Sequence, residues 1–131
     1  MKRNVMKKNV MKKNAGLRIV LAAVTLLAGA PALLSAHHGW TGYDEKAPLT
    51  LTGTVKVSGY ENPHAYVDLQ TSDKVWHVVL APPSRMENRG LAKDMIKAGT
   101  QVTVMGYPHK TEKSELRAEN ITIAGKKTEL R

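Results

Sequence analysis

The sequence predicts a small, mainly β protein: a five-stranded Greek-key barrel with one helix between the third and fourth strands, preceded by a cleavable signal peptide. Stretches in which apolar and polar residues alternate recur after residue 48, which is typical of half-buried strands. A single segment with helix signals separates the first three stretches from the last two. The chain has no cysteine, so one small hydrophobic core has to stabilise the fold without disulfides.

The first 36 residues have the composition of an export signal. A basic start is followed by an apolar stretch over residues 19–28 and then by small residues. The apolar stretch is too short for a typical membrane span. We expect cleavage after Ala36, which makes His37 the first residue of the mature protein; a second cleavage point would free Leu33. The predicted location is the periplasm, with membrane contact only during export, and the alternative is a retained N-terminal membrane anchor.

Charge is concentrated in this leader. The full chain carries a net charge of +9 with 20 basic and 11 acidic residues, and residues 1–36 hold seven of the basic ones and no acidic one. The remainder, about 95 residues long, therefore has 13 basic and 11 acidic residues and a net charge of only +2. A nucleic-acid partner is accordingly not expected, because such partners select strongly basic surfaces.

The barrel domain is expected over residues 49–125, after a polar, turn-rich N-terminal arm at residues 37–48. Within it, residues 71–74 have the length of a hairpin turn. Residues 75–81 are apolar at nearly every position, which predicts a strand that is buried on both faces or central in the sheet. The strands are expected at residues 49–57, 65–70, 75–81, 101–107 and 116–123.

One helix is expected after the third strand. Ser84 and Glu87 have the spacing of a capping box, so the helix is predicted over residues 84–97, with a break near Gly90. Residues 126–131 are expected to be a frayed tail. Three strands, a helix and two strands is the element order of an oligonucleotide/oligosaccharide-binding (OB) barrel. The alternative architecture is an open meander or a small sandwich with a loose helix.

Histidines form the first candidate site. Cleavage after Ala36 would give His37 a free amine beside its imidazole, and these two nitrogens can chelate one metal ion. His38 and His64 are the candidate further ligands, and His109 is a weaker one. Nitrogen ligands of this kind favour copper(II). The alternative is that these histidines are simply solvated, and His77, in the most apolar strand, is expected to be a core residue.

A second candidate is a ligand-binding rim without metal. Trp40, Tyr66 and Trp76 have rings with a polar edge that suit stacking on a ligand. Arg85 and Arg89, together with Arg117, are candidates for contacts to an anion. The alternative is that the aromatic rings belong to the core and the helix arginines to a solvated face.

No arrangement of residues indicates catalysis. The sequence contains no recognisable nucleophile with its base, no paired carboxylates and no phosphate-binding glycine loop. We therefore expect a binding module, and an enzyme that uses histidine-bound copper is the least favoured alternative.

Three motifs stand out: His37-His38-Gly39-Trp40, Asn62-Pro63-His64-Ala65 and Gly99-Thr100-Gln101-Val102-Thr103-Val104-Met105-Gly106-Tyr107. Together they resemble a known family of small exported bacterial proteins, which is defined only as a domain of unknown function. The resemblance covers most of residues 36–125 and implies an exported small β-barrel with no assigned activity. The usual start in that family is similar to Ala-His-His-Ser-Phe, and here Gly39 and Trp40 replace its last two residues. More distantly, the layout is similar to periplasmic OB-fold proteins.

Overall fold

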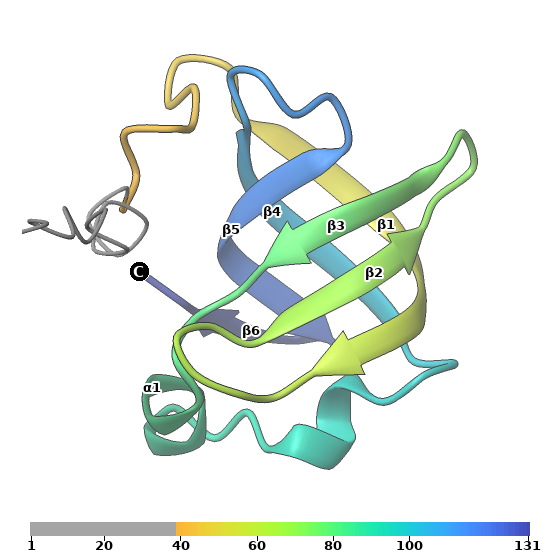
Figure 1. Cartoon of the computed structure of the whole chain (residues 1–131). Helices are drawn as coiled ribbons and strands as arrows, with labels where there is room; N and C mark the ends of the chain where they lie inside the picture. The colour runs from red at the N-terminus through yellow and green to blue at the C-terminus, as the bar shows by residue number, and fades with distance from the viewer. Residues whose placement is uncertain (1–38) are drawn as a thin grey trace, which may run out of the picture. The chain divides into compact units, whose positions relative to one another are not determined.

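The computed structural model describes residues 39–131, so the expected signal peptide and the histidines at positions 37 and 38 lie outside the described residues. The described part is a closed β-barrel with one short α-helix (Figure 1). The predicted fold class is therefore confirmed. The elements are β1 (Leu49–Gly59), β2 (Tyr66–Gln70), β3 (Val75–Val79), α1 (Pro83–Asn88), the 3-10 turn η2 (Lys93–Ile96), β4 (Gln101–Pro108), β5 (Glu115–Ile123) and β6 (Lys126–Glu129).

Strand pairing follows the order β3-β2-β1-β4-β5, and a parallel pairing of β3 with β5 closes the ring. The long strand β1 joins the two halves, since residues 49–54 pair with β4 and residues 54–59 pair with β2. Close strand contact at this crossing requires Gly53, where a Cβ would lie 2.2 Å from the backbone oxygen of Gln70. The barrel is therefore closed by backbone geometry as well as by its core.

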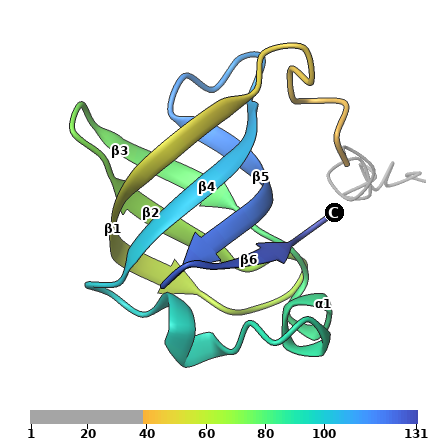
Figure 2. The same ribbon diagram turned by 180° about the vertical axis from the view of Figure 1, so that it is seen from behind.

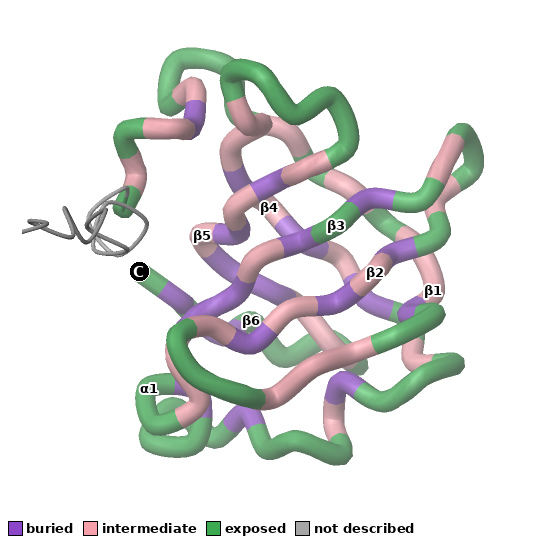
Figure 3. The backbone as a smooth tube through the Cα atoms, viewed as in Figure 1, coloured by how far each residue is buried: buried purple, intermediate pink, exposed green. Residues whose placement is uncertain are grey.

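The core fills the barrel and one of its ends. Inward-facing residues alternate with outward-facing ones along the strands (Figure 3). Met86 from α1, the following Leu91, and Ile96 from η2 are fully buried against them. In Figure 1 the two helical turns lie at one end of the barrel, while the N-terminal arm (residues 39–48) and the β4–β5 loop lie at the other.

The helix is shorter than the sequence indicated. It ends at Asn88, and Gly90 then adopts a positive φ of 79°, so the predicted break at this glycine is confirmed. The predicted capping box is wrong: Pro82 is the N-cap residue and no side chain caps the helix. Pro83 occupies the first helical position, where a missing N–H costs nothing, so the two prolines set the helix start.

Strand β3 lies between β2 and β5, as a central strand does, but it is not buried on both faces. Trp76 and Val78 point inward, whereas Val75 is 37% exposed and the His77 side chain is 46% exposed. His77 is thus not a core histidine; its Nδ1 lies 2.8 Å from Oδ1 of Asp68 on the neighbouring strand. The apolar run indicated two buried faces, but a strand of a small closed barrel has only one face toward the core.

The expected frayed tail is an ordered strand. β6 pairs with residues 120–123 of β5, and Leu130 beyond it is fully buried. β3 and β6 share one edge of β5, because β3 pairs only with residues 115–117 (Figure 2). β6 therefore continues the barrel wall beyond the point where β3 leaves it.

Two arginines from the helical segment hold the outer edge of this last strand. The Nη1 of Arg85 donates to the carbonyl oxygen of Leu130 at 3.1 Å. The Nη1 of Arg89 donates to the carbonyl oxygens of Glu129 and Arg131 at 2.7 and 2.9 Å. Within residues 39–131, no helix has the length and hydrophobicity that a membrane crossing needs.

Substituting Leu130→Ala tests the last strand. Because the side chain is fully buried, we expect the free energy of unfolding in urea to fall by about 3 kcal/mol. Lys127→Ala, on the exposed side of the same strand, is the control and should change it by less than about 0.5 kcal/mol. An equally small effect of Leu130→Ala would mean that the tail frays, as the sequence alone indicated.

Candidate functional site

Arg117 links the N-terminal arm to the barrel. It lies on the outer face of β5, in register with Val79 of β3 and Tyr107 of β4. Its Nη1 donates to the carbonyl oxygen of Gly39 at 2.7 Å, and its Nη2 lies 3.1 Å from Nε2 of His64. One guanidinium thus joins segments 53 and 78 residues away from it in the sequence.

The hydrogen bond to Arg117 fixes the tautomer of His64. A guanidinium can only donate hydrogen bonds, so Nε2 of His64 must accept and the ring proton must reside on Nδ1. The pKa of His64 is lowered from its usual 6.5, first by burial and then by the positive charges of Arg117 and Arg85. His64 is therefore a neutral imidazole near pH 7 and presents an N–H donor on its other side.

Arg85, Arg117 and His64 form what we call the His64 cluster. Arg85 is close enough for its charge to act on both other members, since it lowers the pKa of His64 and of Arg117. The largest cause of the lowered pKa of Arg117 is burial. Among residues 39–131, the ion pairs include neither Arg85 nor Arg117. The cluster thus holds two cations without a paired carboxylate.

One donor of the cluster is unused. The Nε of Arg117 is shielded from solvent and has no hydrogen-bond partner. An enclosed donor without an acceptor costs about 1–3 kcal/mol. The cluster therefore has more N–H donors than acceptors.

Trp40 of the arm covers this cluster. The guanidinium carbon of Arg117 lies 4.5 Å from the centre of the Trp40 ring, and that of Arg131 lies 4.3 Å from it. Both distances are within the range of cation–π contacts. Tyr107 meets the same ring edge-on at 5.9 Å, so the indole is held by two cations and one aromatic side chain.

The nearby acidic residues are engaged with other groups. The hydroxyl of Tyr43 donates to Glu115, and that of Tyr107 donates to Glu119. Burial and the hydrogen bond to Glu115 raise the pKa of Tyr43 well above its usual value. Glu45 pairs with Arg131 at 2.6 Å. These carboxylates stabilise the arm and the tyrosines and form no ion pair with the arginines of the His64 cluster.

The structure places the five predicted rim residues in different surroundings. Trp40 lies over the His64 cluster, and Arg85 belongs to it. Arg89 is bonded to the carbonyls of the chain end. Tyr66 lies on the outer face of β2, with its ring 5.0 Å from that of His77. Trp76 is 8% exposed, and the Nζ of Lys74 lies 4.1 Å from its ring centre.

The predicted metal ligands are only partly within the described residues. His37 and His38 lie outside them, and within residues 39–131 no group of three potential ligand side chains is close enough to hold a metal ion. The Nδ1 of His109, the weaker candidate, instead accepts hydrogen bonds from the backbone N–H groups of Thr111 and Glu112 at 3.2 and 3.0 Å. His109 thus stabilises the β4–β5 loop.

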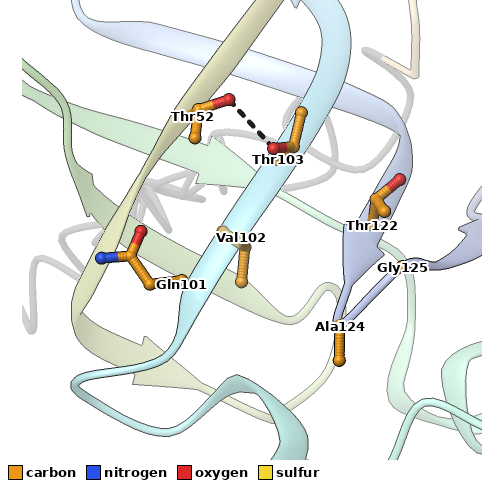
Figure 4. A pocket seen from close by; sticks show the side chains of 7 residues that line it. All are labelled: Thr52, Gln101, Val102, Thr103, Thr122, Ala124 and Gly125. Carbon is orange, nitrogen blue, oxygen red and sulfur yellow. Dashed lines mark hydrogen bonds between the residues drawn. The ribbon is translucent and has the colours of Figure 1, made fainter.

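A shallow hollow of about 160 Å³ lies on the outer surface near the β5–β6 turn (Figure 4). Hydroxyl groups of Thr52, Thr103 and Thr122 line it from three neighbouring strands, and the first two are hydrogen-bonded at 2.9 Å. No charged side chain lines it. The hollow therefore lacks the strong donors that the His64 cluster provides.

Sequence patterns give little indication of Arg131 or of the contact between Arg117 and His64. Arg131 belongs to the segment expected to fray, and no local signal pairs it with Trp40. The contact between Arg117 and His64 depends on the β3–β5 closure, which no motif specifies. Only the placement of His64 in a loop could suggest it.

Substituting Arg117→Met should raise the pKa of His64 toward 6.5, because a neighbouring positive charge is removed while burial is retained. NMR titration of the imidazole measures this. A lowered folded-state pKa means that the unfolded chain binds more protons, so stability falls as the pH drops below about 6.5. We expect this loss to be smaller in the variant. An unchanged His64 pKa, matching that of the control Lys127→Met, would contradict the assignment.

Two solved structures have limited likeness to this chain. One is a crystal structure of TiaS in complex with a tRNA and ATP, with 20% identity and a TM-score of 0.48 over 68% of this chain and 20% of that one. The other is the ZRD-deleted mutant of TiaS in complex with agmatine, with 20% identity and a TM-score of 0.45 over 67% of this chain and 25% of that one. Each likeness thus spans a quarter or less of the longer chain.

A search of curated proteins finds no match. The model of DUF6152, a family of unknown function, matches residues 24–117. This range is well over half of the chain and includes Trp40, His64, Arg85 and Arg117. The chain therefore belongs to the DUF6152 family.

Proposed function

We propose that this protein is an exported, non-enzymatic binding module of the periplasm, and that its His64 cluster holds a small anionic ligand. The observation that carries the proposal is the placement of a partly buried arginine, Arg117, and the more exposed Arg85 around a neutral imidazole, with no carboxylate paired with either arginine. Export is supported by the composition of residues 1–36.

The chemistry of the cluster favours an anion over a cation. Guanidinium groups bind carboxylate and phosphate oxygens through parallel N–H bonds. The lone pair on His64 Nε2 is already used by Arg117, and Nδ1 carries the proton, so the imidazole adds another donor. The two positive charges of Arg85 and Arg117 repel a metal cation but attract an anion. Carboxylates and phosphates share the required geometry.

Calorimetric titration with sodium acetate and with inorganic phosphate tests the proposal and distinguishes the two anions. We expect one of them to bind the protein and to bind Arg117→Met at least tenfold more weakly. The expected binding also weakens as salt rises, because part of it is electrostatic. Lys127→Met removes the same charge from an exposed position and should bind as the unaltered protein does. Equal binding by both variants would refute the proposed site.

Copper binding is the second candidate function, with the His37 amine and imidazole, His38 and His64 as ligands. The supporting observation is that Arg117 bonds to both Gly39 and His64, so the residue next to His38 lies beside the third ligand. Copper(II) would have to displace Arg117 from Nε2 of His64. The same substitution, Arg117→Met, is therefore expected to strengthen copper binding while it weakens anion binding.

Copper(II) titration of protein that begins at His37 tests this second candidate. A bound copper ion near Trp40 should quench its fluorescence, which is isolated in a Trp76→Phe background. A protein with one extra N-terminal residue loses the free amine of His37 and should bind at least tenfold more weakly. Equal binding of the two forms, or an exported protein whose mass corresponds to a start at Leu33, would exclude the N-terminal chelate.

A further inference from the structure

We infer that residues 39–42 of the N-terminal arm act as a lid over the His64 cluster, with Arg131 as its latch. This inference rests on the proposed anion site and concerns its regulation. It follows from three features of the described residues: how the arm is attached, what Trp40 covers, and how the last residues of the chain hold Trp40 in place.

The arm has a firmly attached part and a weakly attached part. From residue 42 onward it pairs by backbone hydrogen bonds with the β4–β5 loop: Lys110 donates to the carbonyl oxygen of Gly42, and Asp44 donates to that of Pro108, both at 2.9 Å. Before Gly42, side chains of the barrel hold the arm, with Arg117 donating to Gly39 and the Nζ of Lys110 donating to Thr41 at 2.9 Å. A turn that includes Gly42 joins the two parts, with the N–H of Tyr43 donating to the carbonyl oxygen of Trp40 at 3.0 Å.

The weakly attached part covers the groups that an anion would need. Arg117 uses Nη1 on Gly39 and Nη2 on His64, and its Nε is shielded and unbonded. An anion can replace Gly39 as the acceptor of Nη1 only if Gly39 moves aside, and Trp40 lies over the same guanidinium. An anion bound there would also be an acceptor close to the unpaired Nε donor. The closed arm thus opposes binding, and the open arm permits it.

Arg131 holds the lid closed. Its guanidinium lies 4.3 Å from the Trp40 ring centre, and its Nη1 pairs with Glu45 at 2.6 Å. The backbone of Arg131 is itself fixed, because Arg89 donates to its carbonyl oxygen at 2.9 Å and the preceding Leu130 is buried. The latch is therefore anchored to the barrel wall, not to a loose chain end.

The expected effect of removing the latch is opposite to a simple charge effect. Arg131→Met removes a positive charge near the site, which by itself would weaken the binding of an anion. If Arg131 instead holds the lid closed, the variant populates the open arm more often, and the apparent affinity rises in proportion to that population. We expect the apparent Kd for the bound anion, phosphate or acetate, to fall by about threefold to tenfold.

Acrylamide quenching of Trp40 in a Trp76→Phe background tests the lid without relying on anion affinity. Quenching should increase in Arg131→Met and in Glu45→Gln, which breaks the same latch from the other side. Lys127→Met serves as the matched control and should leave quenching unchanged. In the protein with its latch intact, adding phosphate or acetate should increase quenching if that anion binds. The urea midpoint of each variant shows whether the barrel remains folded.

The outcomes separate the lid from the proposed function. Unchanged quenching in both latch variants, or a weaker anion affinity in Arg131→Met, overturns the lid. Increased quenching in both variants without anion binding by any form refutes the proposed function and supports the latch. Increased quenching together with tighter anion binding supports both.

Discussion

The short parallel pairing of β3 with β5 is the contact on which the rest of the structure depends. It closes the barrel and places Val79 beside Arg117 on the outer wall. Because β3 then continues into the segment that leads to α1, the same pairing brings Arg85 toward Arg117. The His64 cluster is thus a direct product of barrel closure.

Burial and charge act against each other in this cluster. Arg117 is partly withdrawn from water, and its guanidinium contacts a carbonyl oxygen, an imidazole lone pair and an aromatic face but forms no ion pair with a carboxylate among residues 39–131. Neutral acceptors satisfy hydrogen bonds but leave the net charge in place. The carboxylates that surround the cluster are instead used by Tyr43, Tyr107 and Arg131. This division of partners gives the site its positive character.

Local patterns in the sequence predict much of the fold. Alternation along residues 49–57 and 101–107 identifies β1 and β4, and the break predicted near Gly90 lies just after the helix ends at Asn88, well before the predicted end at residue 97. The exposed face of β3 could not be predicted, because an apolar run does not show which side faces water. The sequence does not indicate β6 either, because its residues are polar. It forms a strand because β3 leaves part of the β5 edge unpaired.

Most residues of the site could be predicted from the sequence, but the contacts between them could not. Trp40, His64 and Arg85 stand out from the sequence by residue type and position, and Arg117 is a natural candidate for anion contacts. Their meeting depends on contacts across 53 to 78 residues, which no local pattern encodes. The tautomer of His64 follows from that meeting, because Nε2 accepts from Arg117 and the ring proton therefore resides on Nδ1.

The arginines beside the end of β6 have a consequence for the exposed edge of the sheet. A strand at the edge of a sheet offers unpaired carbonyl groups to which another chain can add as a further strand. Arg85 and Arg89 already occupy the carbonyls of residues 129–131. Because these backbone oxygens already accept hydrogen bonds from within the chain, they are less available to an added strand.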